Sequence, residues 1–121
     1  MNILIVDDKK SVRDRLSQYL TPQGYTVDIA VNGLDGLEKA QQSNYQLFII
    51  DHLMPLMNGN ILSKNIKKIA GYAKTPILFI TTQAKTNVEK LPEFSLFSQV
   101  LTKPVKENEF LLAVSTLLPK L

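Results

Sequence analysis

The chain has 121 residues, of which 45% are hydrophobic and 21% are charged, a composition typical of one globular domain and not of a disordered chain. It contains no cysteine and a single histidine, which excludes a disulfide scaffold and the usual ligand sets of zinc. The net charge is only +3 and the basic residues are scattered, so direct binding to nucleic acid is not favoured.

Short hydrophobic runs alternate with amphipathic stretches along the whole chain, and we expect these runs to be strands. In chain order the predicted strands are Asn2–Val6, Val27–Ala30, Leu47–Ile50, Ile77–Ile80 and Val100–Leu101. The first, third and fourth are almost continuously apolar, which is typical of strands buried on both faces of a parallel sheet.

The amphipathic stretches predict helices, and each has an apolar stripe. In chain order the stripes are Val12, Leu16, Tyr19 and Leu20; Leu34, Leu37 and Ala40; Leu62, Ile66, Ile69 and Ala70; and Phe110, Val114, Leu117 and Leu118. Asn32 is expected to cap the second helix. Pro92 interrupts the segment between Thr86 and Gln99, so we expect a short, kinked or shifted helix there.

Strict alternation of strand and helix predicts right-handed crossovers and a parallel sheet covered by helices on both faces. Five strands suit the flavodoxin-like α/β fold, a three-layer α/β/α arrangement with strand order 2-1-3-4-5. The glycine-rich motifs of dinucleotide-binding and P-loop proteins are absent from the sequence, so a nucleotide-binding alternative has no support.

Polar side chains that could react or bind an ion follow four of the five predicted strands. They are Asp7 and Asp8 after the first strand, Asp51 after the third, Thr81 and Thr82 after the fourth, and Thr102, Lys103 and Pro104 after the fifth. In this fold, ligands bind at the carboxyl edge of the sheet, between the first and third strands. Neighbouring strands lie about 4.8 Å apart, so the three carboxylates would crowd one pocket and repel one another.

A hard divalent cation held by oxygen atoms, best satisfied by Mg²⁺, would relieve this repulsion. With Lys103 on the far side of Asp51, such a pocket suits a phosphoryl group, and Asp51 could act as the nucleophile that becomes an aspartyl phosphate. Each residue also has a structural alternative: Asp8 could only cap the following helix, and Lys103 could be solvated. Their joint placement around one crevice favours the functional interpretation.

Four motifs carry a resemblance to a known family. They are Ile-Leu-Ile-Val-Asp-Asp at 3–8, Asp-His-Leu-Met-Pro-Leu-Met-Asn-Gly at 51–59, Pro-Ile-Leu-Phe-Ile-Thr at 76–81, and Leu-Thr-Lys-Pro at 101–104. With them the chain resembles, over its whole length, the response-regulator receiver domains of two-component systems, and among these the single-domain chemotaxis regulators.

The resemblance implies a phosphorylatable switch. Asp51 would accept a phosphoryl group from a sensor histidine kinase or a phosphotransfer protein, in a reaction that requires Mg²⁺. Asp7, Asp8, Asp51 and the backbone carbonyl of Leu53 would hold the metal. Lys103 would contact the phosphoryl oxygens, and Thr81 would move its hydroxyl to bond them. In the family a cis peptide bond often precedes the proline that stands here as Pro104.

Several positions depart from the family pattern. Val100 stands where the family usually has the aromatic switch residue, so the coupling of Thr81 to a ring is in question, and output could run through the backbone of residues 82–86. Leu53 cannot orient water, which predicts a long-lived phosphorylated state. Strand alternation directs His52 away from Asp51, so a pH-tuned hydrogen bond or plain surface exposure is favoured over a catalytic role.

Two other functions remain open. A degenerate receiver would act as a phosphate-independent protein-interaction module, and a phosphohydrolase would turn over separate phosphate esters. The second is disfavoured because the first strand lacks an Asp-x-Asp pattern and the chain leaves no room for a cap domain. We therefore expect no enzyme activity beyond self-phosphorylation and autodephosphorylation. Phe94, Leu96 and Phe97 could form either a partner-binding patch or part of the core.

The expected location is the cytoplasm, because the hydrophobic runs are too short for a bilayer and the N-terminus lacks a signal-peptide pattern. Residues 1–121 are treated as one receiver domain, with an unidentified downstream protein as the output partner.

Overall fold

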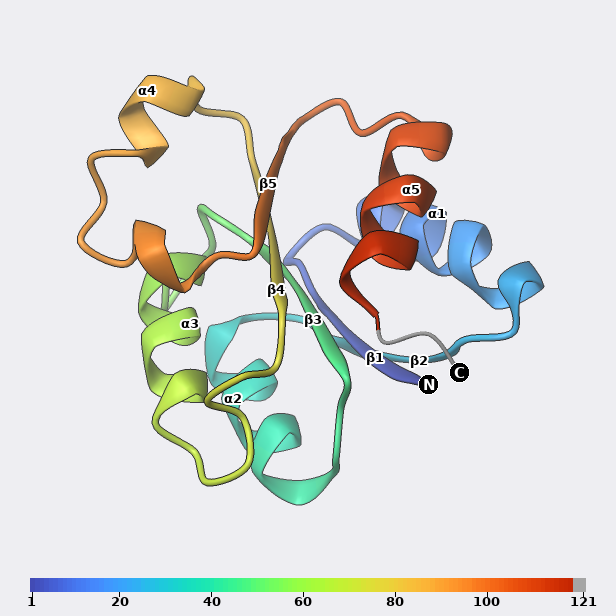
Figure 1. Cartoon of the computed structure of the whole chain (residues 1–121), viewed down its shortest axis with the longest axis horizontal. Helices are drawn as coiled ribbons and strands as arrows, with labels where there is room; N and C mark the ends of the chain where they lie inside the picture. The colour runs from blue at the N-terminus through green and yellow to red at the C-terminus, as the bar shows by residue number, and fades with distance from the viewer. Residues whose placement is uncertain (119–121) are drawn as a thin grey trace.

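A five-stranded sheet forms the centre of the computed structural model, which describes residues 1–118 (Figure 1). The strands are β1 Asn2–Val6, β2 Thr26–Ala30, β3 Leu47–Asp51, β4 Ile77–Thr81 and β5 Gln99–Thr102. All neighbouring strands are parallel, and their order is β2-β1-β3-β4-β5. The predicted flavodoxin-like topology is confirmed, with Asp51 and Thr81 as the last residues of their strands.

Helices cover both faces of this sheet. They are α1 Lys10–Leu20, α2 Gly33–Gln42, α3 Gly59–Lys67, α4 Lys85–Val88 and α5 Glu107–Leu117, with 3-10 turns η1 Thr21–Gln23 and η2 Phe94–Leu96. Helices α1 and α5 lie together on one side, and α2, α3 and α4 lie on the other (Figure 1). Within the described part of the chain, no helix combines the length and apolar character that crossing a membrane requires.

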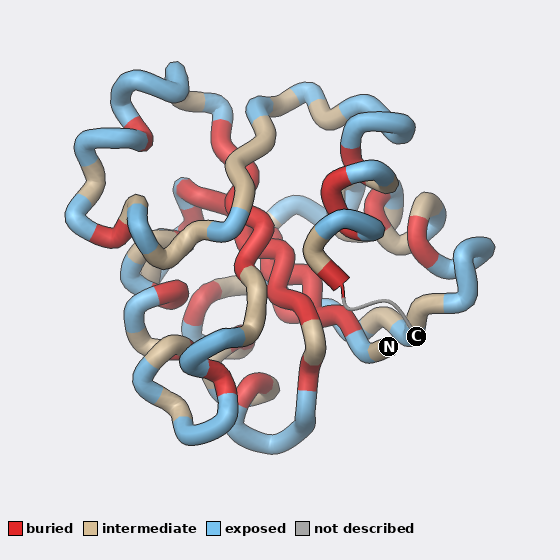
Figure 2. Tube along the Cα trace, in the orientation of Figure 1, coloured by how far each residue is buried: buried red, intermediate tan, exposed pale blue. Residues whose placement is uncertain are grey.

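Every residue of β3 and β4 is buried, and the buried trace runs through the middle of the molecule (Figure 2). Alternate side chains enter two separate cores, as the period of a strand requires. Phe48, Ile50, Ile77 and Phe79 face α2 and α3, whereas Leu47, Ile49, Leu78 and Ile80 face α1 and α5. Each such side chain contributes roughly 1.5–3 kcal/mol on burial, so packing on both faces stabilises the two strands whose carboxyl ends carry Asp51 and Thr81.

The segment between β4 and β5 is the least helical of the connections. Helix α4 has four residues, and only the short turn η2 follows it before β5. This confirms the short helix expected from Pro92. Val88 of α4 is fully buried, and Phe94 and Phe97 pack against the core beside α3, so for these two residues the core interpretation is correct.

The predicted apolar stripes of α1 and α5 are buried or partly buried, as expected. In α2 and after α3, however, the predicted burial of one stripe residue each is wrong. Leu34 is 50% exposed, because the inner face of α2 is formed by Gly33, Gly36 and Ala40 instead. Ala70 is exposed because α3 ends at Lys67, before the stripe is complete. The predicted cap of α2 is confirmed.

Candidate functional site

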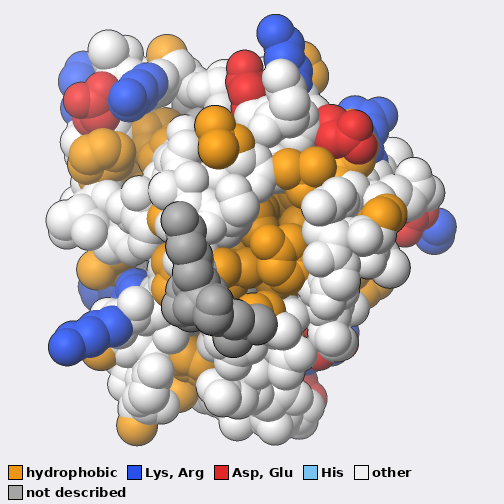
Figure 3. All heavy atoms as spheres, turned by 45° about the vertical axis from the view of Figure 1, so that its right-hand side comes forward, with side chains coloured by type: hydrophobic (Ala, Val, Ile, Leu, Met, Phe, Trp, Pro, Cys, Tyr) orange, Lys and Arg blue, Asp and Glu red, His pale blue; other side chains and the backbone are white. Residues whose placement is uncertain are grey.

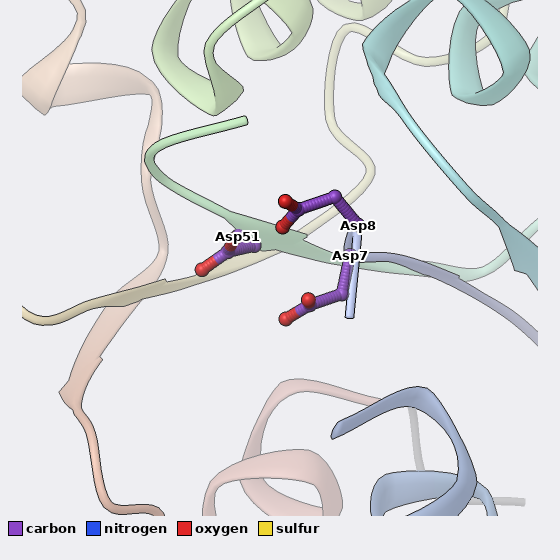
Figure 4. A group of neighbouring side chains, drawn as sticks. All are labelled: Asp7, Asp8 and Asp51. Carbon is purple, nitrogen blue, oxygen red and sulfur yellow. The ribbon is translucent and has the colours of Figure 1, made fainter. Parts of the chain in front are cut away.

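Three carboxylates meet at the carboxyl edge of the sheet, as the sequence predicted. Asp51 ends β3, and Asp7 and Asp8 directly follow β1; Val6 and Ile50 are paired in register, so the two strand ends are adjacent. One oxygen from each carboxylate lies within 4.8 Å of the others, and the three side chains converge on one space (Figure 4).

The turn after β1 is fixed by hydrogen bonds to Asp7. Its Oδ1 accepts from the backbone N–H of Lys9 at 2.8 Å, and its backbone carbonyl accepts from the Arg13 guanidinium at 2.9 Å. No pattern in the sequence indicates the Arg13 contact. The residue that caps α1 is Lys9, without a side-chain cap bond, so the alternative that Asp8 caps this helix is wrong. The Asp8 carboxylate is thereby left facing the cluster.

Lys103 lies between two of these carboxylates. Its Nζ is 2.9 Å from Asp51 Oδ1 and 3.3 Å from Asp7 Oδ2, and its side chain is 15% exposed. The backbone N–H of Lys103 donates to the carbonyl of Thr81 at 2.8 Å, which ties the lysine to the end of β4. The peptide bond from Lys103 to Pro104 is cis, as the family resemblance implied.

The charge balance of the cluster is incomplete. Burial raises the pKa of Asp51, the Lys103 hydrogen bond only partly opposes this, and the charge of Asp7 raises that pKa further. For Lys103, burial lowers the pKa, but the hydrogen bond and charge of Asp51 together with Asp7 outweigh burial and leave it raised. The two nearby ammonium groups, of Lys103 and Lys9, therefore do not fully neutralise the three carboxylates.

Two carboxylate oxygens of the cluster are buried without a hydrogen bond from the described residues, Asp8 Oδ1 and Asp51 Oδ2. The ammonium of Lys9 approaches the first at 3.5 Å. Buried, unsatisfied carboxylate oxygens beside a third carboxylate form the donor set that a hard cation such as Mg²⁺ prefers. The residues present thus fit a magnesium ion.

The loop between β3 and α3 is closed by hydrogen bonds next to the site. The N–H of Gly59 donates to the carbonyl of His52 at 2.6 Å, and Asn58 Oδ1 accepts from the N–H of Met54 at 3.2 Å. Between them Leu56 has a φ of 70°, which is unusual for a leucine, and its side chain is 77% exposed. The side chain of Leu53 is half-exposed beside Asp51; its carbonyl as a metal ligand stays a prediction.

Thr81 is fully buried and is held in place by two neighbours. Its Oγ1 accepts from the N–H of Gln83 at 2.9 Å and lies 2.8 Å from Nδ1 of His52. His52 thus makes a hydrogen bond, as one of the two alternatives expected, and the alternative of surface exposure is wrong because the residue is buried. Burial lowers the pKa of His52. The register that pairs Asp51 with Ile80 would have predicted this contact, since it places residues 52 and 81 side by side.

The surface charge gives no sign of a nucleic-acid interface on the face seen in Figure 3. Basic and acidic side chains of the described residues are interspersed there, and no continuous basic stripe crosses it. This agrees with the small net charge of +3.

Comparison with known proteins adds the family. Residues 3–115 match the model of the response regulator receiver domain. Among curated proteins, the chain is 32% identical over 119 residues to the probable transcriptional regulator ycf29 of Pyropia yezoensis, covering 98% of this chain and 53% of that protein. It is 34% identical over 112 residues to the transcriptional regulatory protein DltR of Streptococcus agalactiae, covering 92% and 49%.

The fold of the chain is also similar to solved structures of response regulators and chemotaxis proteins. The chemotaxis protein CheY4 of Vibrio cholerae superposes with a TM-score of 0.90 at 31% identity, covering 97% of this chain and 98% of that one. The response regulator TrrA of Thermotoga maritima, solved in complex with Mg²⁺ and BeF, has a TM-score of 0.87 at 28% identity, covering 97% and 98%. The chain spans about half the length of the curated relatives but nearly all of these structures.

Proposed function

The chain belongs to the response-regulator receiver domains of two-component systems, and from this we propose that it is a phosphorylatable switch with Asp51 as the phosphoacceptor. The observation that carries the proposal is the convergence of Asp7, Asp8 and Asp51 within 4.8 Å, with the Lys103 ammonium 2.9 Å from Asp51. Acidic groups at this density, beside a lysine, suit a cation and a phosphoryl group together.

In the proposed reaction, a carboxylate oxygen of Asp51 attacks the phosphorus of a phosphohistidine. The new O–P bond forms as the P–N bond breaks, and the electron pair stays on the imidazole nitrogen, which takes a proton from solvent. The Lys103 ammonium holds the developing negative charge of the phosphoryl oxygens, and the Thr81 hydroxyl donates to one of them once they are in place.

Asp7, Asp8, Asp51 and the backbone carbonyl of Leu53 would hold Mg²⁺ in this site, directly or through water. When bound, the ion supplies charge neutralisation for the carboxylates and for the transferred group. Two buried, unsatisfied carboxylate oxygens, on Asp8 and Asp51, support this assignment.

The proposed partners are a sensor histidine kinase or a phosphotransfer protein as donor, and a downstream protein as receiver of the signal. We propose no activity on a separate substrate: the chemistry is self-phosphorylation and autodephosphorylation. A second candidate, a phosphate-independent interaction module, is favoured by Val100 and by the four-residue α4.

Incubation with Mg²⁺ and acetyl phosphate, followed by intact-mass measurement, tests the proposal. We expect the mass of one added phosphoryl group in the wild type and none in Asp51→Asn. The absence of the adduct in the wild type would favour the interaction module, and continuous turnover of small phosphate esters would favour a hydrolase.

Lys103→Ala separates metal binding from the response to phosphate. The carboxylates are intact in this variant, so we expect Mg²⁺ to bind still, whereas the adduct forms slowly and changes the structure little. Loss of Mg²⁺ binding in Lys103→Ala would contradict the role given to the lysine.

A further inference from the structure

The hydrogen bond between His52 and Thr81 joins the two strands that end at the site. Nδ1 of His52 and Oγ1 of Thr81 are 2.8 Å apart, and both residues are buried. The His52 N–H also donates to the carbonyl of Ile80 at 2.9 Å, so the backbone of the histidine is fixed to β4. The backbone that carries the ring is therefore held beside the threonine.

The threonine hydroxyl has one proton to donate. Its oxygen already accepts from the N–H of Gln83 at 2.9 Å. The nearest acceptor for the proton of the Thr81 hydroxyl is Nδ1 of His52, so we assign the hydroxyl as the donor to an unprotonated Nδ1, with the imidazole proton on Nε2. While this bond exists, the same proton is not available to a phosphoryl oxygen on Asp51.

The histidine ring continues into a row of aromatic side chains. His52 and Phe79 have ring centroids 5.0 Å apart, and Phe79 is stacked on Phe97 at 3.8 Å with an interplanar angle of 8°. Phe97 directly follows η2 and precedes β5. Val100, paired in register with Phe79, has no ring to offer.

We propose that His52 is a positioning residue of the switch: it holds the Thr81 hydroxyl in the unphosphorylated protein, and its release on phosphorylation is transmitted through Phe79 to Phe97. The inference rests on the proposed phosphorylation of Asp51. Its two-state element is the Thr81 hydroxyl, which has two competing acceptors, and the packed rings supply a contiguous connection to η2 and β5.

Two variants separate the hydrogen bond from the ring. His52→Phe keeps a ring against Phe79 but has no acceptor for Thr81. His52→Asn keeps a polar atom at the position of Nδ1 but has no ring. Each is titrated with beryllofluoride in saturating Mg²⁺ by calorimetry, while the backbone amide signals of Phe97 and Val100 are followed by NMR.

The hydrogen bond must break when Thr81 turns to the ligand, so His52→Phe is expected to bind beryllofluoride about fivefold more tightly than the wild type. His52→Asn is expected to bind with wild-type affinity within about twofold. In this variant, however, the shift of the Phe97 amide on binding should fall to less than half.

A double-mutant cycle checks that the effect passes through the threonine. In a Thr81→Val background, His52→Phe should leave the affinity for beryllofluoride unchanged. Urea unfolding of each variant confirms that it is folded, and His52→Leu, which also lacks a polar atom, gives the same comparison if the phenylalanine does not fit.

Equal affinities of the wild type and His52→Phe for beryllofluoride would overturn the proposal that His52 holds the Thr81 hydroxyl. An undiminished shift of the Phe97 amide in His52→Asn would overturn the proposal that the change is transmitted through the rings. Wild-type protein that bound no beryllofluoride would overturn the proposed function itself, and the inference with it. The two failures are therefore distinguishable.

Discussion

Gly59 and Asp51 lie so close together that a β-carbon at residue 59 would stand 2.0 Å from the carbonyl oxygen of Asp51. The same atom would be 2.8 Å from Cγ2 of Ile50, so neither the backbone nor the buried side chain leaves room for it. The start of α3 is thus pressed directly against the strand end that carries the proposed phosphoacceptor.

We expect Gly59→Ala to lower the free energy of unfolding by about 3 kcal/mol or more, because the backbone of β3 must move. It should also weaken Mg²⁺ binding by displacing Asp51. Urea unfolding and calorimetry measure the two effects. Gly36→Ala is the matched control: its β-carbon would meet only side-chain atoms, the nearest being Val6 Cγ2 at 3.0 Å, so its cost should be smaller. Equal costs would contradict this explanation.

Asp51→Asn should make the protein more stable in the absence of metal. The raised pKa of Asp51, caused first by burial, means that its ionised form at neutral pH is disfavoured in the folded state. At about 100 times its Kd, Mg²⁺ should stabilise the wild type by about 2.7 kcal/mol and the variant by less.

Thermal unfolding with and without Mg²⁺ measures both effects. Asp14→Asn, which changes an exposed carboxylate paired with Lys10 at 2.7 Å, should leave the Mg²⁺ effect intact. A loss of stability in metal-free Asp51→Asn would show that the Lys103 contact outweighs burial.

Leu53→Asn tests the lifetime of the phosphorylated state. An amide at this half-exposed position can orient water toward the acyl phosphate, and one such hydrogen bond corresponds to a rate increase of about fivefold. Decay of the phosphorylated mass after removal of acetyl phosphate measures the rate. Leu53→Ala uncovers the site without adding a polar group and should decay more slowly than the asparagine variant. Identical decay of Leu53→Asn and the wild type would refute the role of Leu53.

Leu56 provides a test confined to stability. Its φ of 70° places a side chain in a left-handed conformation that costs roughly 1–2 kcal/mol, and no burial compensates. Leu56→Gly should therefore raise the free energy of unfolding by about 1 kcal/mol. Leu53→Gly, in the same loop but without a positive φ, should lower it instead. Parallel urea titrations compare the two, and a destabilised Leu56→Gly would contradict the strain.

The raised pKa of the Tyr45 phenol predicts that the free energy of unfolding falls at alkaline pH. Burial, followed by the hydrogen bond that it donates to Asp28 at 2.7 Å, raises the pKa of this phenol above its usual value of 10.0. The unfolded chain therefore loses the proton first, and stability falls as the pH rises above about 10, by up to about 1.4 kcal/mol per pH unit.

Urea unfolding at pH values from 9 to 11 should show a shallower decline in Tyr45→Phe than in the wild type. Tyr25→Phe, outside this pair, is the control and should follow the wild type. The same slope in Tyr45→Phe and the wild type would rule out the phenol as the source.

The strand order and the acidic cluster could be predicted because both depend on local patterns with strong physical causes. Runs such as Leu47–Ile50 predict buried parallel strands, and the carboxyl ends of such strands meet at one edge. The exposure of Leu34 could not be predicted from helical periodicity alone. The spacing of small residues in α2 allows a different face, formed by Gly33, Gly36 and Ala40, to pack on the sheet.

The contacts of His52 and Arg13 were missed for a different reason. They depend on the register between strands and on side-chain reach across the site, and neither can be derived from one sequence. Strand alternation directed His52 away from Asp51, but it left surface exposure open and did not identify Thr81 as the partner.

The single turn of α4 has a consequence for how this face meets another protein. Its helical bonds run from Val88 to Ala84 and from Glu89 to Lys85, and a helix of one turn has little stability of its own. We therefore expect residues 85–98 to open locally at a lower free energy cost than the buried β4 beside them. A partner protein that bound there would contact a segment with few helical hydrogen bonds, attached to the core by Val88 and Phe97.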